Sequence, residues 1–214
     1  MQSIKLENIN ASYNGHFVLK DINLDIAEGT TQIVIGPSGA GKTTLLKIIN
    51  GLLKPKKGCV KIKGCNLNCK VSELRKCIGY IPQNLGLVKN ITVRNNVLMG
   101  ALGRTSSFRS FFSLFSKEDT KLADHLIQAV GLEGKADKKV FELSGGEKRR
   151  AAIARAFMQK PKILLADEML SDLDFIKVKE IIKEIKQLKK EFNTTVVMVE
   201  HDTKIAKSFG DKVV

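Results

Sequence analysis

The chain has 214 residues, 43% of them hydrophobic, and a formal net charge of +14 at pH 7. A chain of this length buries about 70–75% of its unfolded surface, so we expect a single domain with two lobes. It contains no run of 18 apolar residues, and its first six residues alternate like a strand, which argues against a membrane-spanning or secreted protein.

A glycine-rich loop follows the first strands. The apolar run 33–35 predicts a buried strand, and residues 43–50 predict a helix that stops at Gly51. Between them lies a complete G-x-x-x-x-G-K-[ST] pattern, followed by Thr44; it consists of Gly36, Pro37, Ser38, Gly39, Ala40, Gly41, Lys42 and Thr43. In this context the loop backbone binds phosphate, Lys42 neutralises the β- and γ-phosphates of ATP, and Thr43 offers a hydroxyl to Mg²⁺. The alternative is an ordinary strand-to-helix turn.

Four cysteines cluster in the lysine-rich stretch after this helix: Cys59, Cys65, Cys69 and Cys77. The clustering raises zinc binding as an alternative, but none of them forms a C-x-x-C pair. We therefore expect reduced thiols at small strand or loop positions.

The pattern then becomes mainly helical, and Pro82 marks the change. We expect residues 1–83 and 161–214 to form an α/β catalytic core with an antiparallel part, and residues 84–160 to form a helical lobe. Four aromatic residues of this lobe share one helical face, which serves either the core or a groove for a partner helix: Phe108, Phe111, Phe112 and Phe115.

The sequence Leu-Ser-Gly-Gly-Glu at 143–147 has the Ser-x-x-Glu form of a helix capping box, and residues 148–158 predict the helix that follows. Two glycines inside a helix start, Gly145 and Gly146, cost roughly 1 kcal/mol each relative to alanine. Their bare backbone therefore indicates the close approach of a ligand as well as a cap.

An acidic pair, Asp167 and Glu168, ends the buried strand predicted at 163–166. A carboxylate at a strand end beside a phosphate loop can hold Mg²⁺, and its neighbour can deprotonate an attacking water. We assign Asp167 to the metal and Glu168 to the general base.

Residues 176–192 predict an amphipathic helix, because lysines occupy the positions between apolar residues of helical spacing. Much of the net positive charge therefore lies on a solvent-facing side of this helix. No basic strand carries interleaved aromatic residues, so we expect no nucleic-acid partner; ATP and anionic lipid are the partners that the charge favours. A further buried strand is predicted at 194–200, with His201 at its end.

Together these segments resemble the ATP-binding cassette (ABC) family, with Leu-Ser-Gly-Gly-Glu and the following Ala-x-Ala-Arg-Ala at 152–156 as its signature. The resemblance covers nearly the whole chain. It implies a P-loop NTPase of the α/β class, with a RecA-like, mostly parallel sheet core, an N-terminal antiparallel β subdomain and an α-helical subdomain.

The resemblance also implies roles for single residues. Tyr13 stacks on adenine, Gln83 senses Mg²⁺ and the attacking water and links to a membrane partner, and His201 contacts the γ-phosphate. A set of three residues, Ser144, Gly145 and Gly146, binds nucleotide held by a second subunit. Asp174 binds nucleotide and belongs to the loop at which the two subunits exchange contacts.

A narrower resemblance, to the ATPase subunits of bacterial phosphonate importers, rests on residues 103–119. Several positions depart from the family pattern. Met169 and Leu170 replace the usual proline and small residue, Asp172 adds a carboxylate between subunits, Glu200 precedes His201, and the chain stops in a predicted strand.

These features predict a cytoplasmic ATPase, peripheral on the inner face of the cell membrane, that pairs with itself or a similar subunit and drives separate permease subunits with ATP and Mg²⁺. One alternative is a soluble ABC ATPase acting on nucleic acid or ribosomes, although the chain has neither the coiled-coil insertion nor the second cassette of such relatives. Another is a nucleotide-dependent interaction module with little hydrolysis.

Overall fold

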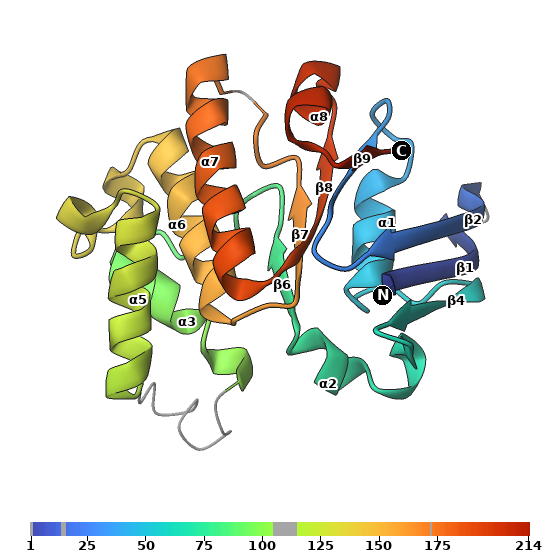
Figure 1. The fold of residues 1–214 in the computed structure, drawn as a ribbon, viewed down its shortest axis with the longest axis horizontal. Helices are drawn as coiled ribbons and strands as arrows, with labels where there is room; N and C mark the ends of the chain where they lie inside the picture. The colour runs from blue at the N-terminus through green and yellow to red at the C-terminus, as the bar shows by residue number, and fades with distance from the viewer. Residues whose placement is uncertain (1, 14–15, 105–114, 172) are drawn as a thin grey trace.

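The computed structural model describes residues 2–13, 16–104, 115–171 and 173–214. The chain forms two sheets with helices around them, and the parallel sheet stands between helix α1 on one side and helices α6 and α7 on the other (Figure 1). Three of the aromatic residues predicted to share a face, Phe108, Phe111 and Phe112, lie outside the described residues. The fourth, Phe115, packs against the core.

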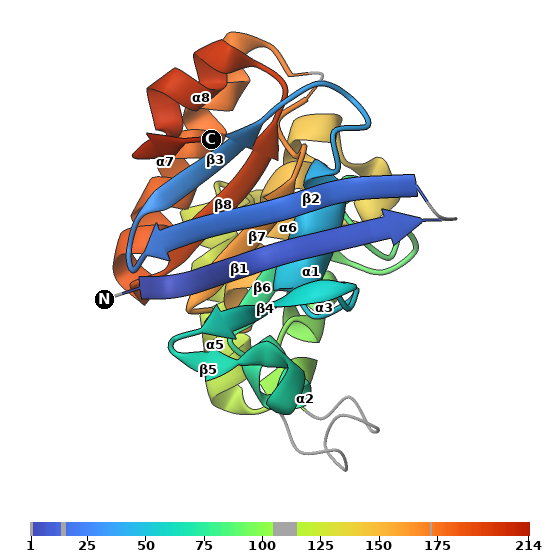
Figure 2. The same cartoon turned by 90° about the vertical axis from the view of Figure 1, so that its right-hand side faces the viewer.

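The N-terminal sheet is antiparallel and has the strand order β2-β1-β4-β5. It consists of β1 (Gln2–Tyr13), β2 (His16–Ala27), β4 (Lys57–Ile62) and β5 (Cys65–Asn66). Figure 2 shows β1 and β2 crossing in front of α1, so this sheet covers the helix that follows the glycine-rich loop.

The second sheet has the order β6-β7-β8-β3-β9, and all its neighbouring strands are parallel. Its strands are β6 (Ile78–Ile81), β7 (Ile163–Asp167), β8 (Thr195–Glu200), β3 (Thr31–Ile35) and β9 (Lys212–Val213). The parallel core and the antiparallel β part that the sequence predicts are thereby confirmed.

The helices are α1 (Lys42–Ile49), α2 (Val71–Arg75), α3 (Val93–Met99), α5 (Lys117–Ala129), α6 (Gly145–Met158), α7 (Phe175–Phe192) and α8 (Thr203–Phe209). Short 3₁₀ turns lie at Leu67–Cys69, Leu102–Arg104, Glu133–Lys135 and Val140–Glu142. Helix α6 starts earlier than residue 148, because the Ser144 cap places both glycines in its first turn.

The parallel sheet separates two hydrophobic clusters. Along β8, Val197 and Val199 pack toward α1 and the antiparallel sheet, whereas Val196 and Met198 pack toward the other helices. This alternation is the period of a strand buried on both faces. The register pairs Ile35 with Glu200 and Asp167 with Val199, so the carboxyl ends of β3, β7 and β8 lie at the same edge.

Candidate active site

The glycine-rich loop joins β3 to α1 and depends on left-handed backbone at two glycines. Gly39 has φ 81° and Gly41 has φ 88°. A Cβ on Gly41 would lie 2.8 Å from the Val18 side chain and 2.9 Å from that of Leu19, whereas one on Gly39 would meet nothing within 4 Å. The loop thus packs against β2 at Gly41 and leaves the start of α1 bare, which suits an anion.

Lys42 lies at the centre of the site with its side chain 6% exposed. Its Nζ donates to the backbone carbonyls of Gly36 and Pro37, both at 2.9 Å. The same atom lies 3.4 Å from His201 Nδ1 and 3.9 Å from Glu168 Oε1. A single buried cation therefore connects the loop to the ends of β7 and β8.

Asp167 is buried and faces the first turn of α1. Thr43 Oγ1 donates to Asp167 Oδ1 at 3.1 Å, and the Tyr80 side chain lies close enough to this carboxylate to interact with it. Burial raises the pKa of Asp167, against the effect of the Thr43 hydrogen bond, and the charge of Glu168 raises it further. Burial likewise raises the pKa of Tyr80 to about 12, with Asp167 adding to it. A carboxylate and a hydroxyl are hard oxygen ligands, which fit Mg²⁺.

Glu168 has φ 48°, a left-handed conformation that costs a residue with a side chain roughly 1–3 kcal/mol. Its N–H donates to the Val199 carbonyl at 3.0 Å, and the Ser171 hydroxyl donates to its carbonyl at 2.8 Å. His201 Nε2 lies 2.5 Å from Oε1, and Gln83 Nε2 donates to Oε2 at 3.1 Å. The unusual backbone thus directs the carboxylate to a point between two predicted site residues.

His201 closes the site on the side of β3. Its Nδ1 lies 3.1 Å from the Gly36 carbonyl oxygen. Because Ile35 pairs with Glu200, the next residues of the two strands, Gly36 and His201, lie side by side. Lys42, Thr43, Gln83, Asp167, Glu168 and His201 are therefore brought together. Of the remaining loop residues, Pro37, Ser38 and Ala40 are exposed, and Thr44 is buried.

The Ser-Gly-Gly segment does not belong to this cluster of side chains. Ser144 caps α6 reciprocally with Glu147, and Glu147 also pairs with Lys135, which lowers the pKa of Glu147. Helix α6 covers the face of the parallel sheet opposite to α1 (Figure 1). One chain by itself does not bring Ser144 and Gly146 to its own glycine-rich loop.

Asp174 caps α7 by accepting from Lys177 N at 2.9 Å, and its hydrogen bonds with Lys177 lower the pKa of Asp174. The predicted role of Asp172 falls outside the described residues. Tyr13 ends β1, where it pairs with His16, but its side chain lies outside the described part of the chain. Met169 and Leu170, which depart from the family pattern, are both 1% exposed and belong to the core.

Sequence reasoning missed four residues around the site. Tyr80 reaches Asp167, and Glu200, 2% exposed, accepts from Leu170 N at 3.2 Å. Arg149 and Arg155 of α6 donate to backbone carbonyls near Glu168 and Gln83. The position of Glu200 immediately before His201 was a usable signal. Arg155 belongs to the signature at 152–156 but received no role of its own, and Arg149 looked like an ordinary helix residue.

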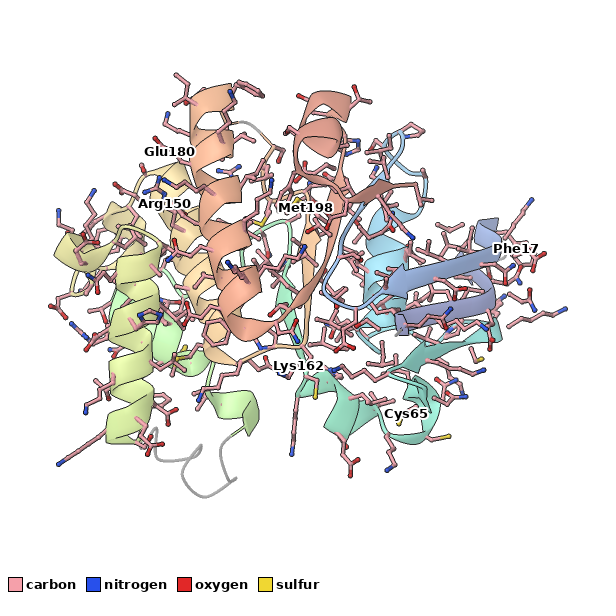
Figure 3. All side chains as sticks on the ribbon, viewed as in Figure 1. Phe17, Cys65, Arg150, Lys162, Glu180 and Met198 are labelled. Atoms are coloured by element: carbon pink, nitrogen blue, oxygen red, sulfur yellow. The ribbon has the colours of Figure 1, made fainter. Side chains whose placement is uncertain are left out.

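The four cysteines are free, and Cys65 and Cys69 are exposed; Figure 3 labels Cys65 at the edge of the antiparallel sheet. Within the described residues, no group of three or more His, Cys, Asp or Glu side chains could hold a metal ion. The same part of the chain has no helix both long and apolar enough to span a bilayer.

The family described as ABC transporter matches residues 19–171. The phosphonates import ATP-binding protein PhnC of Lactobacillus johnsonii is 41% identical over 216 residues, which cover 99% of this chain and 85% of the relative. The protein of that name from Staphylococcus epidermidis is 37% identical over 219 residues, which cover 100% of this chain and 85% of the relative. A dimeric bacterial ABC transporter cassette has a TM-score of 0.86 at 34% identity, covering 99% of this chain and 93% of that one. A dimeric cassette bound to ADP and Pi has the same TM-score at 33% identity, with the same coverage.

Proposed function

Because the chain belongs to the ABC transporter family, we propose that it is the ATP-binding and ATP-hydrolysing subunit of an importer whose membrane subunits are separate chains. The observation that carries the proposal is the meeting of the glycine-rich loop with Glu168, whose two carboxylate oxygens face His201 and Gln83. The names of the relatives favour a phosphonate-type solute. The protein then acts in the cytoplasm, bound to the inner face of the membrane through its permease.

The loop binds the phosphates of ATP through its backbone N–H groups and the start of α1. Lys42 leaves its carbonyl partners to neutralise the β- and γ-phosphates, and Tyr13 stacks on adenine. Thr43, Asp167 and Gln83 would hold Mg²⁺, since their oxygens form a hard ligand set. When bound, Mg²⁺ neutralises charge that develops on the phosphates.

Glu168 is the general base of hydrolysis. It accepts a proton from the water whose oxygen forms the new bond to the γ-phosphorus, while the bond from that phosphorus to the β–γ bridging oxygen breaks and ADP leaves. Gln83 and His201 orient the carboxylate from its two oxygens. His201 also lies against the loop, where it can contact the γ-phosphate.

Two chains complete each site. The Ser144–Gly146 segment of one copy covers the nucleotide held by the loop of the other, and the loop before Asp174 lies between the two subunits. The support is the separation of the two segments within one chain and the dimeric state of related cassettes. The partner is a second copy or a similar ATPase subunit.

The permease docks at a cavity of about 510 Å³ lined by residues that include Arg75, Tyr80 and Gln159. Tyr80 lines this cavity and interacts with Asp167, which also raises the pKa of Tyr80. A cytoplasmic segment of the permease seated there would contact a residue that touches the nucleotide site.

The test is Glu168→Gln. Because the amide cannot accept the proton, we expect kcat to fall by about 10²- to 10⁴-fold while ATP binding persists and the dimer accumulates with ATP. Glu191→Gln, at an exposed carboxylate paired with His125, controls for the charge change. Normal turnover by Glu168→Gln would remove Glu168 from this role.

A further inference from the structure

Helix α6 connects three parts of the nucleotide machinery through its backbone and two arginines. Ser144 caps its start, and Arg149 lies little more than one turn further on. Arg149 Nε donates to the Met169 carbonyl at 2.6 Å, and its Nη2 donates to the Ser171 carbonyl at 2.5 Å. One side chain therefore bridges two carbonyls of the turn that follows Glu168.

That turn is held from both sides. Between the two carbonyls, Leu170 N donates to Glu200 Oε1 at 3.2 Å, so consecutive backbone groups of the turn are fixed by α6 and by the end of β8. Met169 and Leu170 are buried, and the Ser171 hydroxyl returns to the Glu168 carbonyl. The left-handed backbone of Glu168 is thereby stabilised by contacts outside the residue itself.

Arg155, further along the same helix, makes the equivalent contact with the segment after Gln83. Its Nη2 donates to the Leu85 carbonyl at 2.7 Å and its Nη1 to the Gly86 carbonyl. Both of these residues have left-handed backbone, with φ 62° and 58°. The side chains of Gln83 and Glu168 are hydrogen-bonded to each other, so α6 holds both backbone segments of this pair.

The neighbouring arginine shows that these contacts are specific to position. Arg150 points to α7, where its guanidinium pairs with Glu180 at 2.7 Å and Glu184 at 3.2 Å; Figure 3 labels Arg150 and Glu180 between the two helices. Arg150 thus fastens α6 to α7, whereas Arg149 reaches the turn after Glu168.

We propose that Arg149 and Arg155 are positioning residues that link the Ser144–Gly146 tip of a chain to Glu168 and Gln83 of the same chain. The inference rests on the proposed two-chain site, because the tip then contacts nucleotide held by the partner. A bound nucleotide in one site shifts α6, and α6 shifts the general base of the other site. Hydrolysis at the two sites is coupled through this helix.

The experiment measures ATP hydrolysis against ATP concentration for the wild type, Arg149→Met and Arg149→Lys. We expect Arg149→Met to lower kcat by about 10- to 100-fold, because a displaced base loses its attack geometry, with the half-saturating ATP concentration within about twofold. We also expect the rate to depend on ATP concentration sigmoidally in the wild type and hyperbolically in Arg149→Met. Lysine keeps the charge but cannot bridge both carbonyls, so Arg149→Lys falls between the two.

The control is Arg94→Met, which removes an arginine of α3 that pairs with Asp124 and Asp137 away from the site. Equal kcat and cooperativity for Arg149→Met and Arg94→Met would overturn the inference. If Arg149→Met does not fold, wild-type kinetics of Arg149→Lys would overturn it. Two results together would instead overturn the proposed two-chain site, and the inference with it. They are hyperbolic kinetics of the wild type and a Glu168→Gln variant that never dimerises in the presence of ATP.

Discussion

At the residue scale, Glu200 is a carboxyl group 2% exposed at the end of β8. Burial raises the pKa of Glu200 to about 7, the Leu170 N–H and Arg149 lower it, and the charges of Glu168 and Asp167 raise it again. A carboxyl whose pKa is higher in the folded state binds more protons there, so it stabilises the fold relative to its ionised form only at low pH. Its contribution is lost as the pH rises from about 4.5 to about 7.

Glu200→Gln tests this linkage, because glutamine keeps the oxygen that accepts from Leu170 N and never ionises. We expect the variant to be more stable than the wild type by up to about 3 kcal/mol at pH 8 and no more stable near pH 4.5. Urea denaturation at several pH values measures the difference. Burial also raises the pKa of Glu184 to about 7, but Glu184 is present in both proteins and cancels. A difference that does not vary with pH would contradict the assignment.

Some residues of the site could be predicted from the sequence and others could not, and the difference lies in the sequence separation of their contacts. Lys42, Thr43, Asp167 and Glu168 were predictable because a loop motif and a strand end specify them locally. Tyr80, Glu200 and Arg149 interact with residues between 20 and 87 positions away in the sequence, which no local pattern records. The side chain of Tyr13 was assigned only from the family resemblance, and its role stays a prediction.

At the element scale, the strands of the parallel sheet were predictable because each is a short apolar run ending in polar residues, as at 33–35, 163–166 and 194–200. The order of the strands in the sheet was not predictable, since β3, which comes early in the sequence, lies between β8 and β9 from its C-terminal end. The start of α6 was predicted too late, because the two glycines disfavour helix locally and the Ser144–Glu147 cap overrides them.

The loop that opens α1 offers a comparison between two glycines of similar backbone. Gly39→Ala places a methyl group in open space, so we expect only the left-handed strain of about 1 kcal/mol. Gly41→Ala adds contacts under 3 Å with Val18 and Leu19, which cost about a further 1–3 kcal/mol and move the loop away from β2. Chemical denaturation and ATP titration measure both effects. Equal losses in the two variants would show that crowding against β2 does not shape the loop.

At the scale of the whole molecule, the separation of the Ser-Gly-Gly tip from the glycine-rich loop has a consequence for the single chain. A Cβ on Gly146 would meet only the Lys177 side chain, at 3.9 Å, and Gly146 is not among the glycines with positive φ. The folded monomer therefore has room for a large side chain there. In the proposed two-chain site, this space becomes limiting when a second chain approaches.

Gly146→Arg separates these two states. We expect its monomer to fold and to bind ATP within about twofold of the wild type, because its own loop is untouched, while ATP-driven pairing weakens by about 100-fold or more from steric and charge conflict with the partner's loop. The measurement is size-exclusion chromatography with ATP in the Glu168→Gln background. Gly134→Arg, at an exposed glycine of the 3₁₀ turn Glu133–Lys135, adds the same side chain elsewhere and should leave pairing intact. If Gly146→Arg pairs as well as Gly134→Arg, the tip of α6 does not face a partner's nucleotide, and each chain must hydrolyse ATP with its own residues alone.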